Sequence, residues 1–250
     1  MKNGTVVGVM GVLLGIFLIC VQPRAWGHEI RYRLTDLGAI NGSDSRALGI
    51  NNTGTVVGWA YQGGEINHAY ISDGAGDQVR SIHQFGHTSV AQGISERGIA
   101  VGHTVLDGGE IRATRWNTAT NSQELIGPDN IHSRGFSVSE NGFIAGQFLS
   151  ANGWRAFRHQ DSGGNQQFEN LGTLGGNMST ALSVNESGTV VGYSLASSAS
   201  PGDWIERAFV WTPIQGMHDL GTLGGPHSRA LSINNHGDIV GQAWNSDNRP

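Results

Sequence analysis

The sequence predicts an all-β protein built from tandem repeats of about 44 to 49 residues. Three markers recur in one register: a serine, a turn glycine, and a second glycine four residues after the turn glycine. Each series is spaced by 44, 44, 46 and 49 residues. A period in this range is typical of propeller blades and of solenoid turns. The serines are Ser45, Ser89, Ser133, Ser179 and Ser228, and the second glycines are Gly58, Gly102, Gly146, Gly192 and Gly241.

Each repeat contains four short strand candidates. Apolar and polar residues alternate in them, and glycine and asparagine bound them, which is the pattern of β-strands. The chain after residue 27 keeps no helical period, and its 39 glycines in 250 residues also disfavour helices. In the first unit the candidates are Arg31–Gly38, Ser45–Asn51, Thr55–Tyr61 and His68–Ser72.

We expect the repeats to form a β-propeller of four-stranded blades, with a β-solenoid as the alternative. A single domain, 28–250, would hold five units, at about 30–75, 76–119, 120–163, 164–213 and 214–250. The fifth unit stops where its fourth strand should begin, so the sequence predicts an incomplete array. An unpaired edge strand exposes backbone N–H and C=O groups. Self-association through an open edge is therefore expected.

Two short patterns predict local geometry. The link between the second and third strand candidates starts with Asn or Ser, as at Asn51, and ends with glycine, as at Gly54. Such side chains bond to nearby backbone and glycine permits a positive φ, so we predict a tight hairpin turn. In the second strand two positions are small in every unit, such as Ala47 and Gly49. Small residues there predict the close approach of another backbone.

The N-terminus, residues 1–27, has the pattern of a secretory signal peptide. Lys2 precedes an apolar run from Val6 to Val21, and Ala25-Trp26-Gly27 resembles a cleavage site. The run has 16 residues, fewer than the ~20 that span a bilayer. We therefore expect cleavage after Gly27, with an uncleaved membrane anchor as the alternative. The mature protein would then be secreted, periplasmic or at the cell surface, without a stable membrane span.

Charge and cysteine content restrict the partners. After residue 27 the chain has no cysteine, so neither disulfides nor a thiolate metal site are available. Removing Lys2 and Arg24 leaves 13 basic against 20 acidic residues, a balance of −7. An acidic domain without basic runs argues against nucleic acid as a partner. An extracellular glycan or protein is the expected kind of partner.

The repeated motifs resemble those of the bacterial extracellular HAF repeat. They are LGTLGG, at 171–176 and 220–225, S-x-A-x-x-[IV]-N-x-x-G-x-V-V-G, and [HR]-A-[FY]. The resemblance covers about Arg31 to Asn245 and implies export and repetition, without any catalytic residue. Two departures stand out. No unit has a literal His-Ala-Phe, and the second unit has HQFG, His83–Gly86, where others carry a DLG-like string.

No motif of catalysis is present, and we expect neither cofactor nor metal. The sequence lacks G-x-S-x-G and H-E-x-x-H, and its histidines do not follow metal-ligand spacing. We expect a non-catalytic binding or scaffold module; the alternative is a glycan-active lyase or hydrolase with a site at a central axis. One equivalent position varies in a way that suits sugar or peptide recognition, unless its side chains only pack between blades. It holds Trp59, His103, Gln147, Tyr193 and Gln242.

Overall fold

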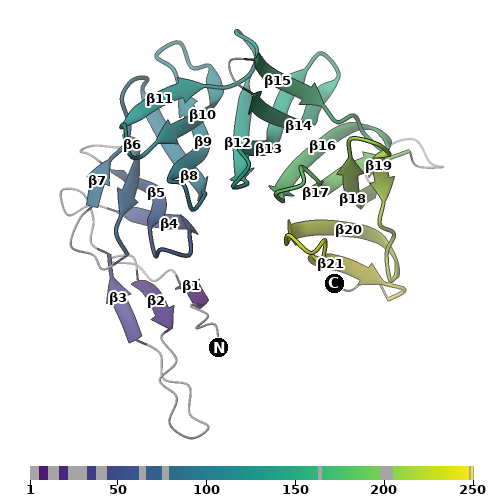
Figure 1. The fold of residues 1–250 in the computed structure, drawn as a ribbon. Coiled ribbons are helices and arrows are strands. Elements are labelled where there is room, and N and C mark those ends of the chain that lie inside the picture. The colour runs from purple at the N-terminus through teal and green to yellow at the C-terminus, as the bar shows by residue number, and fades with distance from the viewer. Residues whose placement is uncertain are drawn as a thin grey trace, which may run out of the picture.

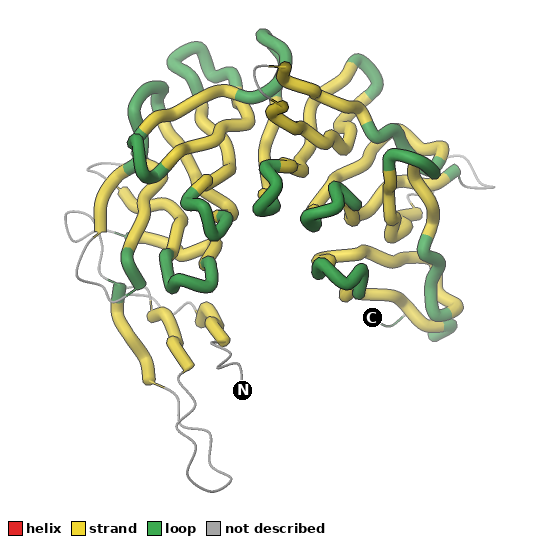
Figure 2. Tube along the Cα trace, in the orientation of Figure 1, coloured by secondary structure: helices red, strands yellow, loops and turns green. Residues whose placement is uncertain are grey.

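The computed structural model describes residues 6–10, 17–21, 33–37, 44–61, 66–74, 79–162, 165–197, 205–247 and 249. All regular structure in these residues is β-strand, so the predicted all-β class is confirmed. The strands form six separate sheets (Figures 1 and 2). No helix in this part of the chain is long and apolar enough to cross a membrane.

Four of the sheets are four-stranded antiparallel meanders, and strands consecutive in sequence are neighbours within them. Sheet 1 contains β4 (Ser45–Ile50), β5 (Val56–Tyr61), β6 (Asn67–Ser72) and β7 (Val79–Ser81). Sheet 2 contains β8 (Thr88–Ile94), β9 (Ile99–Val105), β10 (Ile111–Asn117) and β11 (Ser122–Leu125). Sheet 3 contains β12 (Ser133–Val138), β13 (Phe143–Ser150), β14 (Gly153–Ser162) and β15 (Asn165–Asn170). Sheet 4 contains β16 (Gly175–Val184), β17 (Val190–Ala196), β18 (Ile205–Thr212) and β19 (Gly216–Asp219).

The other two sheets lie at the two ends of the series. Sheet 5 has β20 (Gly224–Ile233) and β21 (Ile239–Asn245). The N-terminal sheet has β1 (Val6–Met10), β2 (Phe17–Val21) and β3 (Arg33–Asp36). Strands β1 and β2 lie within the predicted signal peptide, whereas its expected cleavage point, Gly27, is outside the described residues.

The sheets follow one another around an arc, and the first strand of each of sheets 1 to 5 lies on the inner side (Figures 1 and 2). Each sheet begins one strand later than the predicted repeat unit, because the first strand of a unit is the outer strand of the preceding sheet. One equivalence was placed wrongly. The DLG-like string of the second unit is Ser81-Ile82-His83 and not His83–Gly86, because Ile82 N donates to Ala69 O as Leu171 N donates to Ala156 O.

A β-bulge interrupts the same point of every inner strand, as between Ala47 and Gly49 in β4. A side chain on Gly58, opposite this bulge in β5, would overlap the Arg46 carbonyl oxygen. A Cβ on Gly49 would lie 2.9 Å from Gln92 O and 3.0 Å from Gly93 Cα in β8. The predicted close approach of neighbouring backbones is therefore confirmed at sheets 1 and 2.

The core lies between consecutive sheets rather than within one. Val57 packs with Ala91 and Trp116 of sheet 2, and Val191 packs with Ala230 of sheet 5. The valine before Val57, Val56, packs against Leu37 on the other side of sheet 1. A strand that is buried on both faces needs consecutive apolar residues, which explains the Val-Val-Gly repeat.

The marker serines join each sheet to the next. Each is buried, and from Ser89 onwards its Oγ accepts the N–H of the alanine in the preceding sheet's [HR]-A motif. For Ser133 and Ala113 the distance is 2.9 Å, and for Ser179 and Ala156 it is 2.8 Å. A buried N–H needs an acceptor, so these two motifs recur together because one satisfies the other.

The predicted hairpin turns are confirmed. The turn glycines have positive φ, such as 84° at Gly54 and 76° at Gly188. Asn51 Oδ1 accepts the Thr55 N–H at 2.9 Å, which is the expected turn bond. The same side chain also donates through Nδ2 to Ser95 O, at 3.1 Å, in the turn of the next repeat. The turns thus stabilise one another as well as their own hairpins.

Candidate binding site between sheets 2 and 3

The five side chains predicted to form a ring occupy one position on the second strand of each of sheets 1 to 5. Four are half-buried, and Gln242 is exposed. No hydrogen bond, ion pair or ring contact among the described residues joins two of the five. Trp59 lies under Arg46, which is opposite it in sheet 1, with 5.5 Å from Cζ to the ring centroid. The next three meet the following sheet instead.

The interface between sheets 4 and 5 (interface 4/5) is neutralised internally. Arg229 of β20 stacks over the Tyr193 ring, with 4.9 Å from Cζ to the centroid. Its guanidinium also binds Glu206 of β18 at 2.5 Å. The Glu206 N–H donates to His227 Nδ1 at 3.2 Å. Cation, carboxylate and aromatic ring therefore satisfy one another.

The interface between sheets 3 and 4 is uncharged at the same level. Thr180 of β16 donates from Oγ1 to Gln147 Oε1 at 2.8 Å. Thr180 is buried and Gln147 is half-buried. A hydroxyl and an amide can satisfy each other without a counter-ion, so this contact has the chemistry of packing between sheets.

The interface between sheets 2 and 3 (interface 2/3) repeats the geometry of interface 4/5 with different chemistry. Arg134 of β12 has the place of Arg229, and His103 of β9 has the place of Tyr193. The Ile111 N–H donates to His132 Nδ1 at 3.0 Å, as the Glu206 N–H donates to His227. Ile111 thus stands where interface 4/5 has its carboxylate.

Arg134 consequently lacks an acidic partner in the part of the chain that the structure describes. Its guanidinium lies 5.4 Å from the centroid of the Trp154 ring. Its Nε is shielded from solvent without a protein acceptor, and so is Nδ1 of His103. Buried polar atoms are normally hydrogen-bonded. Both atoms are therefore unsatisfied within interface 2/3.

Burial and the charge of Arg134 lower the pKa of His103 to about 4. Burial is the larger cause, because it disfavours the charged imidazolium, and the nearby guanidinium adds repulsion. At neutral pH His103 is therefore an uncharged ring. Arg134 supplies the positive charge of this pair.

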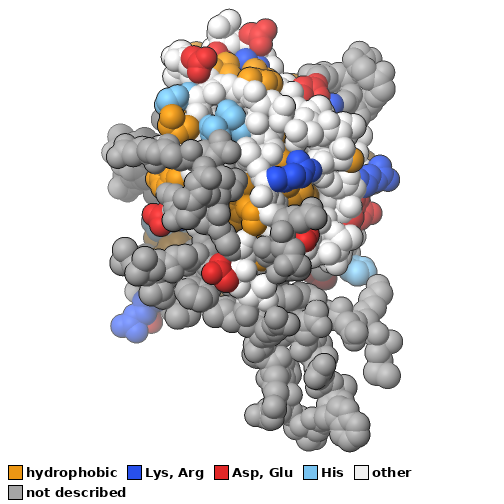
Figure 3. Space-filling view, turned by 90° about the vertical axis from the view of Figure 1, so that its left-hand side faces the viewer, with side chains coloured by type: hydrophobic (Ala, Val, Ile, Leu, Met, Phe, Trp, Pro, Cys, Tyr) orange, Lys and Arg blue, Asp and Glu red, His pale blue; other side chains and the backbone are white. Residues whose placement is uncertain are grey.

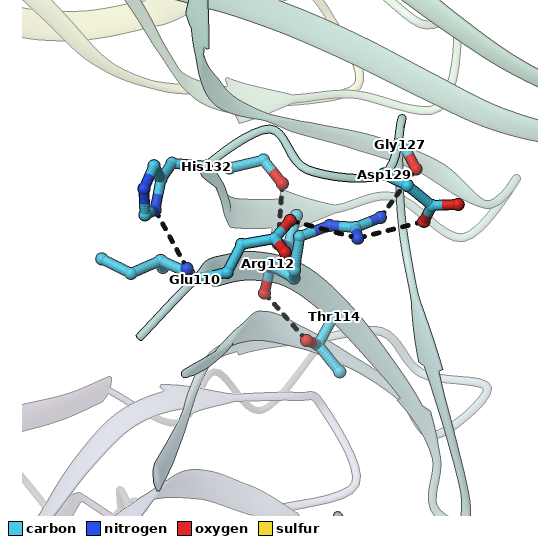
Figure 4. Close-up of polar contacts among 9 residues, drawn as sticks. Glu110, Arg112, Thr114, Gly127, Asp129 and His132 are labelled. Carbon is cyan, nitrogen blue, oxygen red and sulfur yellow. Dashed lines mark hydrogen bonds and ion pairs between the residues drawn. The ribbon is translucent and has the colours of Figure 1, made fainter. Parts of the chain in front are cut away.

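The outer part of interface 2/3 is held by Arg112 of β10, the [HR] residue of its repeat (Figure 4). Only 3% of Arg112 is exposed. Its guanidinium binds Glu110 at 3.3 Å, Asp129 at 3.1 Å and the Gly127 carbonyl at 2.9 Å. These bonds tie the β9–β10 turn to the connection between sheets 2 and 3, which leads to His132 and Arg134.

Between sheets 1 and 2 the equivalent contact is a histidine pair. His68, in place of Arg112, stacks on His83, in place of Gly127, with ring centroids 3.9 Å apart. His83 Nδ1 also lies 2.8 Å from Ser89 Oγ. Burial lowers the pKa of both histidines. His68 and His83, the two residues that depart from the repeat pattern here, therefore stack on each other, and this contact suits a structural role.

Other kinds of site receive no support from the described residues. They contain no group of His, Cys, Asp and Glu side chains that could hold a metal ion. On the face in Figure 3, acidic and basic side chains are scattered wherever the atoms are not grey, and neither kind forms a continuous patch. A nucleic-acid-binding surface needs such a basic patch.

No family model matches this chain, and a search of curated proteins finds no match either. The site must therefore be interpreted from its own geometry.

Sequence reasoning found His103 but missed Arg134 as its neighbour. The two are 31 positions apart, and they meet only because the second strand of sheet 2 packs against the inner strand of sheet 3. A signal was available in the serine register. The residue after each marker serine changes type from repeat to repeat, as the position of His103 does, although the residues on either side of it change little. It is Arg46, Val90, Arg134, Thr180 or Arg229.

Proposed function

We propose that this protein is an exported, non-catalytic binding module whose ligand contacts the variable side chains beside the inner strands. One observation carries the proposal. The residues that pack the sheets stay small or apolar from repeat to repeat, whereas two positions between them vary among aromatic, basic, amide, hydroxyl and aliphatic side chains. Variable side chains on a rigid repeat scaffold are the usual form of a binding surface.

The scaffold that we propose is a β-propeller of four-stranded blades. Its support is that each four-stranded sheet is an antiparallel meander of consecutive strands, with its first strand on the inner side of the arc. In a β-solenoid, strands of successive repeats would pair with one another in continuous sheets. The core residues between adjacent sheets also favour stacked blades.

Export and membership of the HAF-repeat group remain part of the proposal. They are supported by the signal-like residues 1–27 and by the shared order of motifs. Cleavage after Gly27 would remove β1 and β2 and leave β3. Mass spectrometry of exported material should find His28 as the first residue, and a chain that begins with Met1 would contradict cleavage.

The ligand class that we favour is an extracellular glycan. Aromatic rings offer a flat apolar face for a sugar, and the neighbouring arginines and amides offer hydrogen bonds to its hydroxyl groups. The alternative, a glycan-active enzyme, would need free acidic groups. Glu110 in interface 2/3 and Glu206 in interface 4/5 are not free, because each is bound by an arginine.

Binding to a panel of immobilised polysaccharides would test this function, with release of reducing ends measured in parallel. We expect saturable binding without turnover. Trp59→Ala should weaken binding about tenfold or more, which corresponds to the ~1–3 kcal/mol of a stacked aromatic contact. The control is Ile214→Ala, at a 95% exposed residue between β18 and β19. Turnover, or equal loss in the control, would contradict the proposal.

A further inference from the structure

We propose that Arg134 in interface 2/3 binds the carboxylate of an acidic sugar, so that the ligand is a glycan containing uronic acid. The inference rests on the proposed binding function and names its ligand chemistry. It also makes a separate claim about one subsite, which small carboxylates can test without a polymer.

Interface 4/5 shows what this subsite lacks. Arg229 and Arg134 stand at equivalent positions, and histidines in the same place, His227 and His132, accept backbone N–H groups in the same way. Glu206 supplies a carboxylate 2.5 Å from Arg229. The equivalent residue beside Arg134 is Ile111, so the protein supplies no carboxylate there. A ligand carboxylate would take the place that Glu206 has in interface 4/5.

The groups around Arg134 can accommodate an anion. A half-buried guanidinium binds a carboxylate strongly because it offers paired donors in a weakly solvated place. Nε of Arg134 and Nδ1 of His103 are shielded from solvent, whereas the two terminal nitrogens of Arg134 form no hydrogen bond or ion pair with the described residues and can meet a ligand. His103 is uncharged at neutral pH, so it can donate a hydrogen bond without adding charge.

The surroundings favour a sugar over an acidic peptide as the source of the carboxylate. The Trp154 ring lies beside Arg134, and Gln147 is opposite Arg134 in the register of β12 and β13. An aromatic face, an amide and a guanidinium together match a sugar ring that carries hydroxyls and a carboxylate.

The subsite itself is tested by NMR titration of the His103 imidazole in the full-length protein, with galacturonate as probe. A bound carboxylate compensates the charge of Arg134 and should raise the pKa of His103. Galactose, which has no carboxylate, should leave it unchanged. A His103 signal that responds equally to both sugars, or to neither, would overturn the assignment of Arg134.

The ligand class is tested with oligogalacturonate and its methyl ester, a neutral ligand with the same number of sugars. We expect Arg134→Gln to reduce the affinity for the acid form at least tenfold and to leave the affinity for the ester unchanged. Ile111→Glu should have the same effect, because it places a carboxylate where Glu206 stands in interface 4/5. Arg115→Gln, which breaks an ion pair with Glu124 elsewhere in sheet 2, is the matched control.

The outcomes separate the two proposals. If the wild type binds acid and ester equally, or if Arg134→Gln and Ile111→Glu behave like Arg115→Gln, the acidic-sugar inference is wrong while the binding function stands. If no glycan binds, the binding function is wrong, and the galacturonate titration still decides whether Arg134 holds a carboxylate. Tighter binding of a glutamate-rich peptide than of oligogalacturonate would overturn the sugar assignment.

Discussion

Single hydroxyl groups join the sheets of this protein, and their removal should be costly. We predict that Ser133→Ala lowers the free energy of unfolding by about 1–3 kcal/mol, because the buried N–H of Ala113 loses its acceptor. Denaturant unfolding would measure the loss, and the Ala113 amide should exchange its hydrogen faster. Ser246→Ala, at an exposed residue, is the control. Equal stability of the two variants would contradict the role of the serine.

His103 should make stability depend on pH. Its pKa of about 4 in the folded protein lies below the value of 6.5 that it has when unfolded. The unfolded chain therefore binds more protons at acidic pH, and stability is lost as the pH falls from about 6.5 towards 4. Thermal unfolding across this range should show a smaller loss for His103→Gln than for wild type. Parallel curves would exclude His103 as the cause, since His68 and His83 titrate in both proteins.

At the scale of elements, each hairpin turn depends on one glycine. Gly188→Val should lower the free energy of unfolding by about 1–3 kcal/mol or more, because a β-branched residue is strained at a φ of 76°. The added Cβ would also lie 2.7 Å from Arg158 Nη1 and 3.0 Å from the Phe143 ring. Denaturant unfolding measures the change. Gly108→Val, where nothing lies within 4 Å of the new Cβ, is the control.

The strands and turns were predictable from the sequence because their determinants are local. The alternation in Ser45–Asn51 and the turn from Asn51 to Gly54 depend on neighbours along the chain, and both were predicted correctly. The bulge at residue 48 was not predicted. The sequence indicates it only through Gly58, where any side chain would overlap a carbonyl on the partner strand. The error at His83–Gly86 arose similarly, because a histidine in the glycine position is recognisable only beside His68.

The candidate site was less predictable than the fold. The position of His103 was found because it varies within a fixed register. Its relation to Arg134 depends on how two sheets stack, and the missing acid at Ile111 is visible only by comparison with Glu206 in another interface. Contacts between sheets join residues that are far apart in the sequence, and no local pattern indicates which residues meet. The repeats therefore make the scaffold predictable but not the chemistry at its interfaces.

At the scale of the whole molecule, the free side of β21 should govern association. In sheets 1 to 4 the second strand pairs with a third strand, whereas among the described residues β21 pairs only with β20. Val240 is 64% exposed, although its equivalents Val57 and Val191 are buried against a following sheet. An unpaired strand with an exposed apolar side chain is a template for pairing with another chain.

We therefore expect the isolated protein to associate with itself as its concentration rises, through the free edge of β21. Val240→Lys should shift it towards the monomer, because a charged side chain on an edge strand opposes strand pairing and removes the apolar contact. Sedimentation equilibrium would measure the change. Ile214→Lys adds the same charge at a 95% exposed residue outside the strands, so it should associate like wild type. A wild type that stays monomeric at all concentrations, or a control that dissociates as far as Val240→Lys, would show that this edge does not drive association.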